Sequence, residues 1–171
     1  MGAPRREIPL PYAAPVLAAL ANCAHSLHDR EVLARRAVEA IAKELPQAGW
    51  TGIYWLHGDV LDLGPFVGPA TEHVRIPVGR GVCGTAIAEN HDQVVDDVRE
   101  RPNYLACSAT TRSEIVVLIR AGGRVVGQID LDSDRVAAFS AEDHRFLKMV
   151  AGALGSLLMD LPAVPPRPAE G

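Results

Sequence analysis

Two cysteines and three acidic residues are the side chains of this sequence best suited to chemistry. Cys83 and Cys107 lie 24 positions apart, each beside polar or glycine-rich sequence. The apolar runs that follow carry Glu114, Asp130 and Asp132. Thiols attack electrophiles and exchange with disulfides, and carboxyl groups bind cations or move protons. The layout predicts a thiol site that faces a carboxylate-lined pocket.

The two cysteines differ in how well ordinary packing explains them. We expect Cys83 near the start of a short helix, where unpaired backbone N–H groups and the helix dipole favour a thiolate. The alternative for this residue is a small buried hydrophobe. Cys107 lies outside any periodic apolar face, so packing explains it poorly. Neither C-x-x-C nor H-x-x-x-H spacing accompanies the pair, so no metal site is expected.

The acidic residues are placed by the alternation of a strand. Asp130 and Asp132 alternate with Ile129 and Leu131, which puts both aspartates on one face. One interpretation is a solvated outer face. In the other, Glu114 faces them from a neighbouring strand and completes an acidic cluster. Such a cluster binds an amino group or holds a carboxyl with a raised pKa that can donate a proton.

Three glycines, Gly79, Gly81 and Gly84, match the G-x-G-x-x-G pattern of dinucleotide sites. An irregular loop and a hairpin follow this pattern, where a dinucleotide fold requires a crossover to a parallel strand. We therefore expect the glycines to let the backbone turn tightly and approach a ligand closely.

Four aromatic residues fall in the first expected hairpin: Trp50, Tyr54, Trp55 and Phe66. Aromatic residues in strands usually pack in the core. Trp50 and Tyr54 are nevertheless candidates for the wall of a pocket.

Composition favours one domain in a reducing compartment. The chain has 171 residues, 48% of them apolar, and we expect a flexible N-terminus over 1–10, a domain over 11–160 and a disordered proline-rich tail over 161–171. A net charge of -4 without a run of Lys or Arg argues against nucleic acid and against an anionic membrane as partners. Three cysteines are too few for a secreted disulfide framework, which favours the cytoplasm.

Hydrophobic periodicity places helices at both ends of the domain and strands between them. Helices are expected from Tyr12, from an N-cap at Asp29, and after a capping box at Ser140 and Asp143. Extended segments are expected over 50–56, 60–66, 73–78, 93–98, 114–121 and 124–132, and a short helix over 85–90. This order predicts an α+β fold with a central, mostly antiparallel sheet flanked by helices.

Six motifs then suggest a family. They are Gly-Trp-Thr-Gly-Ile-Tyr at 49–54, Leu-Gly-Pro-Phe at 63–66, Arg-Ile-Pro-Val-Gly-Arg-Gly-Val-Cys-Gly-Thr-Ala at 75–86, Leu-Ala-Cys at 105–107, Ser-Glu-Ile-Val-Val at 113–117 and Ile-Asp-Leu-Asp-Ser at 129–133. Together they resemble the free methionine-(R)-sulfoxide reductases, which are built on a single GAF domain. The resemblance implies a GAF-like fold.

By this resemblance, a thiolate attacks the sulfoxide sulfur of free methionine-(R)-sulfoxide, methionine leaves and the cysteine becomes a sulfenic acid. A second cysteine condenses with it to a disulfide, which thioredoxin reduces, and no bound cofactor is needed. Cys107 matches the nucleophile and Cys83 its resolving partner, although sequence leaves the order open. The family's substrate-holding and proton-donating carboxylates match Glu114, Asp130 and Asp132, and its pocket aromatics match Trp50 and Tyr54.

The sequence also departs from the family. His73 stands at or beside the place of a third family cysteine, and the loop after Cys107 lacks the usual Asp and Asn. The alternative function is therefore a non-catalytic GAF-type module that binds a small ligand or senses redox state. Oligomeric state is left open, with a homodimer as one alternative.

Overall fold

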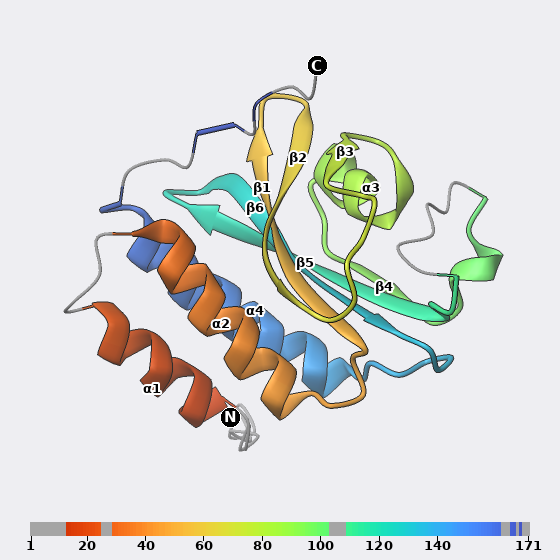
Figure 1. The fold of residues 1–171 in the computed structure, drawn as a ribbon, viewed down its shortest axis with the longest axis horizontal. Coiled ribbons are helices and arrows are strands. Elements are labelled where there is room, and N and C mark those ends of the chain that lie inside the picture. The colour runs from red at the N-terminus through yellow and green to blue at the C-terminus, as the bar shows by residue number, and fades with distance from the viewer. Residues whose placement is uncertain (1–12, 25–28, 103–108, 162–164, 167, 169–171) are drawn as a thin grey trace, which may run out of the picture.

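The fold is a six-stranded antiparallel sheet with helices on both faces, seen in a computed structural model that describes residues 13–24, 29–102, 109–161, 165–166 and 168. Helices α1, α2 and α4 lie together against one face, and α3 lies on the other (Figure 1). The helices are α1 (Ala13–Ala24), α2 (Arg30–Glu44), α3 (Gly81–Glu89) and α4 (Ala141–Leu158), with a 3-10 turn η1 (Val98–Glu100). The strands are β1 (Trp50–His57), β2 (Val60–Val67), β3 (Arg75–Pro77), β4 (Gln93–Val95), β5 (Ser113–Ala121) and β6 (Arg124–Ser133). The predicted α+β fold is confirmed.

Sheet order brings distant segments of the chain together. The strands are arranged β3-β2-β1-β6-β5-β4, so the hairpins β1–β2 and β5–β6 meet where β1 pairs with β6. In this register Trp50 lies opposite Asp132, and Gly52 opposite Asp130. On the other side of β6, Glu114 of β5 lies opposite Asp132. The centre of the sheet therefore gathers residues that are far apart in sequence.

Each face of the sheet has its own apolar core. Ile129 and Leu131 of β6 pack with α1, α2 and α4, and both side chains are fully buried. Tyr54 and Val116 pack on the opposite face, against Val82 and Cys83 of α3 and their neighbours. The alternation of the strands places the aspartates of β6 on this second face.

Local signals in the sequence set the ends of the two long helices. The Asp29 side chain accepts a hydrogen bond of 2.8 Å from the Glu31 N–H, as expected of an N-cap. Ser140 and Asp143 form a capping box at the start of α4. Both predicted caps are confirmed. None of the described helices is long and apolar enough to cross a membrane.

The short elements around α3 differ from the expected ones. Helix α3 begins at Gly81, four residues before the predicted start, and β3 covers only Arg75–Pro77. Gly79 and Gly81 have positive φ angles of 87° and 61°, which a glycine adopts without strain. A Cβ on Gly84 would lie 2.5 Å from the Pro77 carbonyl oxygen. At Gly84 the close approach is therefore to the chain's own backbone, where we had expected a ligand.

Candidate functional site

The α3-facing side of the sheet buries three acidic side chains. The exposed fractions of Glu114, Asp130 and Asp132 are 1%, 0% and 4%. The register of β5 and β6 sets Glu114 opposite Asp132 and Val116 opposite Asp130. The interpretation of Asp130 and Asp132 as part of a solvated outer face is thus wrong, and the structure contains the acidic cluster. Buried carboxyls without compensation are costly, so a cluster like this usually serves a function.

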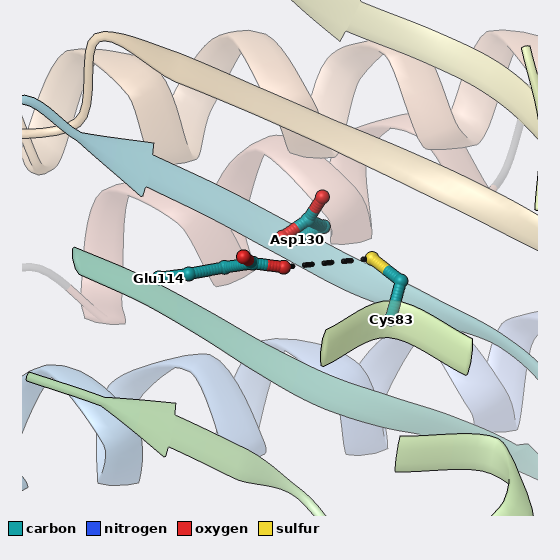
Figure 2. A group of neighbouring side chains, drawn as sticks. All are labelled: Cys83, Glu114 and Asp130. Carbon is teal, nitrogen blue, oxygen red and sulfur yellow. Dashed lines mark hydrogen bonds between the residues drawn. The ribbon is translucent and has the colours of Figure 1, made fainter. Parts of the chain in front are cut away.

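Cys83 reaches the same cluster from the first turn of α3. Its thiol donates a hydrogen bond to Glu114 Oε1 across 3.8 Å. The Cys83 sulfur, a Glu114 oxygen and an Asp130 oxygen all lie within 4.8 Å of one another. Figure 2 shows the three side chains converging from α3, β5 and β6. One thiol and two carboxyls therefore share a single buried space.

Burial alters the acidity of both carboxyls, and the charges of the neighbouring aspartates add to the shift of Glu114. The pKa of Glu114 is raised well above its ordinary value, first by burial and then by the charges of Asp130 and Asp132, while the Cys83 thiol lowers it in part. Burial raises the pKa of Asp130 to about 7, and polar contact with Cys83 and Glu114 offsets part of that rise. Neither carboxyl forms an ion pair within the described part of the chain. The pair can therefore hold a proton near neutral pH.

Aromatic rings form a wall beside the cluster. Trp50 stacks on Phe66 with ring centroids 5.6 Å apart, and lies 6.1 Å from the Tyr54 ring. Trp50 Nε1 donates to the Pro69 carbonyl (3.2 Å), and the Tyr54 hydroxyl donates to the His73 carbonyl (2.9 Å). These hydrogen bonds hold both rings in place. Both candidate pocket aromatics thus lie on the face that carries the carboxylates.

Trp55, the other aromatic of β1 in the predicted hairpin set, faces the opposite way. It is buried in the core under α1, α2 and α4, and its Nε1 donates to Glu31 Oε1 across 2.6 Å. Alternation along β1 separates it from Tyr54.

A cavity of about 360 Å³ opens next to Trp50 and Asp132. It is lined by residues of four segments: Gly49 and Trp50, Pro69 and Ala70, Thr110 and Thr111, and Asp132 to Asp134. Ligand pockets span ~300–1,000 Å³, so this volume suits a ligand of amino-acid size. Apolar ring surface and a buried carboxylate on one cavity wall match an amphipathic, amine-bearing ligand.

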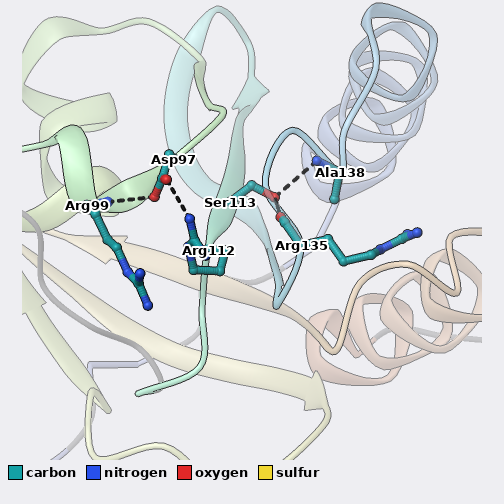
Figure 3. A network of polar contacts seen from close by, with 6 residues as sticks. All are labelled: Asp97, Arg99, Arg112, Ser113, Arg135 and Ala138. Atoms are coloured by element: carbon teal, nitrogen blue, oxygen red, sulfur yellow. Dashed lines mark hydrogen bonds and ion pairs between the residues drawn. The ribbon is translucent and has the colours of Figure 1, made fainter.

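The loop before β5 is anchored by a polar network (Figure 3). Arg112 donates to Asp97 Oδ2 across 2.7 Å, and this hydrogen bond holds the pKa of Asp97 below its usual value. Ser113 Oγ donates to the Arg135 carbonyl (2.7 Å) and accepts from the Ala138 N–H (3.3 Å). Thr110 and Thr111 of this loop line the cavity, so the network fixes one of its walls.

Two further residues are Cys107, a predicted site residue, and Gln128, which was not predicted. Cys107 lies outside the residues that the structure describes, so its predicted role stays a prediction. Gln128, which the sequence analysis passed over, is fully buried in β6 opposite Tyr54. Its amide nitrogen and oxygen have no hydrogen-bond partner among the described residues. The alternation along β6 places Gln128 on the same face as Asp130, but an uncharged amide in a strand carries no signal of a functional role.

Comparison with known proteins places this geometry in a family. The model of the GAF domain matches residues 28–159. The free methionine-R-sulfoxide reductase of Escherichia coli K12 is 38% identical over 142 residues, which cover 83% of this chain and 77% of that protein.

Solved structures agree with the sequence comparison. The structure of a free methionine-R-sulfoxide reductase from Neisseria meningitidis, in complex with its substrate, matches with a TM-score of 0.81 and 32% identity over 90% of this chain and 92% of that one. A type II free methionine-R-sulfoxide reductase from Thermoplasma acidophilum matches with a TM-score of 0.72 and 39% identity over 78% of this chain and 97% of that one. The chain therefore belongs to the free methionine-R-sulfoxide reductases, an oxidoreductase family built on the GAF domain.

Proposed function

We propose that this protein reduces free methionine-R-sulfoxide to methionine, with Cys107 as nucleophile and Cys83 as resolving cysteine. The observation that carries the proposal is the buried cluster of Cys83, Glu114 and Asp130 beside a cavity lined by Trp50 and Asp132. Relatives that are named as reductases of this substrate support the activity. Family membership alone would leave open which side chains act.

The proposed reaction balances as two steps. In the first, the Cys107 thiolate attacks the sulfoxide sulfur, a proton is taken up, and methionine leaves while Cys107 becomes a sulfenic acid. In the second, the Cys83 thiol attacks the sulfenic sulfur, a disulfide forms and water departs. A buried thiol that donates a hydrogen bond to Glu114 suits the second step, because the carboxylate can accept its proton as the sulfur attacks.

The carboxyls take two different roles in this proposal. Glu114 and Asp130, whose pKa values are raised, supply the proton for the departing oxygen. Asp132 lies on the cavity wall and binds the substrate's ammonium group. Trp50 and Tyr54 contact the methyl–sulfur end. A carboxylate for the amine and rings for the side chain would select a free amino acid over a peptide-bound one.

Thioredoxin is the proposed reductant of the disulfide, and the cytoplasm is the proposed compartment because its redox poise keeps such cysteines reduced. The alternative function, a GAF module that binds a ligand or senses redox state, keeps the same cavity. It predicts ligand binding without any consumption of reductant.

The decisive experiment follows NADPH oxidation with thioredoxin, thioredoxin reductase and free methionine-R-sulfoxide. We expect turnover with the R epimer and none with the S epimer. Cys107→Ser should release no methionine, whereas Cys83→Ser should release about one equivalent and then stop, because its sulfenic acid has no resolving thiol. Cys23→Ala is the matched control and should keep turnover, since α1 lies on the far face of the sheet. If the folded protein showed no turnover, the proposal that it is a reductase would be wrong.

A further inference from the structure

Three potential metal ligands meet in one buried place, although each comes from a different element. They are the Cys83 sulfur of α3, a Glu114 oxygen of β5 and an Asp130 oxygen of β6, at most 4.8 Å from one another (Figure 2). Short local spacings of Cys and His predict no metal site in the sequence. The three ligands come from segments far apart in the chain, and only the pairing of the sheet and the packing of α3 bring them together.

The cluster also leaves hydrogen-bonding capacity unused. Asp130 has no exposed surface, and neither of its carboxylate oxygens has a hydrogen-bond partner within the described residues. The Glu114 Oε2 atom is also buried and has no hydrogen-bond partner among the described residues. Neither carboxyl is paired with a Lys or Arg in the described part of the chain. Buried anionic groups of this kind are paired or coordinate a metal in most proteins.

The distances suit a small tetrahedral cation. With a Zn–S bond of about 2.3 Å and Zn–O bonds of about 2.1 Å, tetrahedral angles place sulfur about 3.6 Å from oxygen and two oxygens about 3.4 Å apart. The Cys83 sulfur lies 3.8 Å from Glu114 Oε1. The longest separation in the cluster, at most 4.8 Å, exceeds these values by an amount that rotation of one carboxylate covers.

The donor set decides which cation fits. Calcium and magnesium prefer oxygen ligands alone, whereas a thiolate together with carboxylates suits zinc. Three protein ligands with a fourth position open is also the ligand count of sites that exchange their remaining ligand. We propose that the reduced protein binds Zn²⁺ through Cys83, Glu114 and Asp130.

Zinc at this place would withhold Cys83 from disulfide formation, a consequence that rests on the proposed function. Binding converts the Cys83 thiol to a thiolate and releases its proton, together with any proton held by the two carboxyls. Formation of the disulfide would in turn remove the sulfur ligand and expel the metal. The same cluster would then respond to both zinc and oxidants, and zinc would hold the protein in its reduced, inactive form.

The test replaces zinc with Co²⁺, whose thiolate complexes absorb in the near ultraviolet, and titrates the fully reduced, full-length protein. We expect a sulfur-to-cobalt absorption band that saturates at one equivalent and is abolished by one equivalent of Zn²⁺. The band should disappear in Cys83→Ser, and Asp130→Asn should weaken binding at least about tenfold. Asp132→Asn neutralises the third buried carboxylate, which is not one of the three ligands, and should weaken binding less than Asp130→Asn does.

Absorption distinguishes this site from half-buried His–Asp pairs such as His144–Asp92, which lack sulfur. Circular dichroism of each variant establishes that it is folded. A missing band, or a band that survives in Cys83→Ser, overturns the proposal. Because the titration requires no turnover, its failure would leave the reductase proposal untouched, and absence of reductase activity would leave the metal site untouched.

Discussion

At the scale of single residues, the site depends on carboxyls that are kept from water. Asp130 is fully buried and its pKa is raised to about 7, so close to neutrality it exchanges between its charged and neutral forms. Glu114 is shifted in the same direction. A proton donor for a reaction at neutral pH needs a pKa of this kind. Burial raises the pKa of both carboxyls, and the neighbouring aspartates raise that of Glu114 further.

The raised pKa of Asp130 makes stability depend on pH with a definite sign. The folded protein binds a proton more tightly than the unfolded chain, so this group stabilises the fold at low pH and the contribution is lost as pH rises from about 4 to about 7. Its size is on the order of 4 kcal/mol. Asp130→Asn should therefore gain stability relative to wild type as pH rises, in urea unfolding between about pH 5 and pH 8.

Parallel pH profiles for wild type and Asp130→Asn would show that Asp130 does not titrate differently in the folded state.

Asp132 and Asp134 line the same cavity but differ in burial, which separates a specific contact from a general electrostatic effect. If Asp132 binds the substrate's ammonium group, Asp132→Asn should raise KM about tenfold to a hundredfold with a smaller change in kcat. Asp134→Asn removes the same charge from the exposed rim and should change KM little. Steady-state kinetics with methionine-R-sulfoxide measure both, and equal effects would argue for a long-range field instead of a contact.

At the scale of elements, the sequence was most informative where one local interaction sets a boundary. Asp29 and the capping box at Ser140 were predicted correctly because each bonds to backbone within three residues. The start of α3 was missed because Gly81, a poor helix former in general, opens it with a positive φ. The position of α3 is set by the close approach of Gly84 to the Pro77 carbonyl at the end of β3, and no local sequence pattern predicts that contact.

Gly84 should be essential for that contact. An added Cβ would lie 2.5 Å from the Pro77 carbonyl oxygen and 3.0 Å from the Gly79 nitrogen, both backbone atoms that cannot yield cheaply. We expect Gly84→Ala to destabilise the protein by about 1–3 kcal/mol in urea unfolding and to slow turnover, because α3 carries Cys83.

Gly152 of α4 is the matched control, since nothing lies within 4 Å of its added Cβ. Gly152→Ala should be neutral or stabilise by up to about 1 kcal/mol, as alanine favours a helix. A Gly84→Ala variant as stable as Gly152→Ala would show that α3 shifts without strain.

The anchored loop before β5 offers a second test at this scale. Arg112 holds Asp97 with its side chain, whereas Arg99 bonds the same carboxylate through its backbone N–H (Figure 3). Arg112→Ala should release the cavity wall at Thr110 and Thr111 and lower kcat/KM about tenfold to a hundredfold, since small misplacements of reacting groups are costly. Arg99→Ala keeps its backbone bond and should remain active. If the two variants were equally active, the hydrogen bond between Arg112 and Asp97 would not be required for turnover.

At the scale of the whole molecule, the antiparallel sheet separates the apolar core under α1, α2 and α4 from the face that carries the candidate site. The acidic cluster was foreseen as one of two interpretations, because alternation places Asp130 and Asp132 on the same face but leaves open which face is buried. Tertiary contacts decided this: β1 pairs with β6 and sets Trp50 opposite Asp132, and α3 packs over the same face. The burial of Gln128 was not predicted for the same reason, since it depends on the tertiary packing around this residue.

This separation predicts that stability and activity can be changed independently. Leu20 of α1 is buried with α2 and α4 on the far face, whereas Val116 lies opposite Asp130 on the face of the site. Leu20→Ala should lower the free energy of unfolding by about 2–5 kcal/mol yet leave kcat/KM unchanged at a temperature where the variant is folded.

Val116→Ala should lose both stability and activity, because the cavity it creates adjoins the buried carboxyls and admits water to them. Urea unfolding and steady-state kinetics on the two variants measure the two quantities separately. If Leu20→Ala lowered kcat/KM as much as Val116→Ala did, the sheet would be transmitting changes from one face to the other. The helices of the far face would then belong to the working parts of the site.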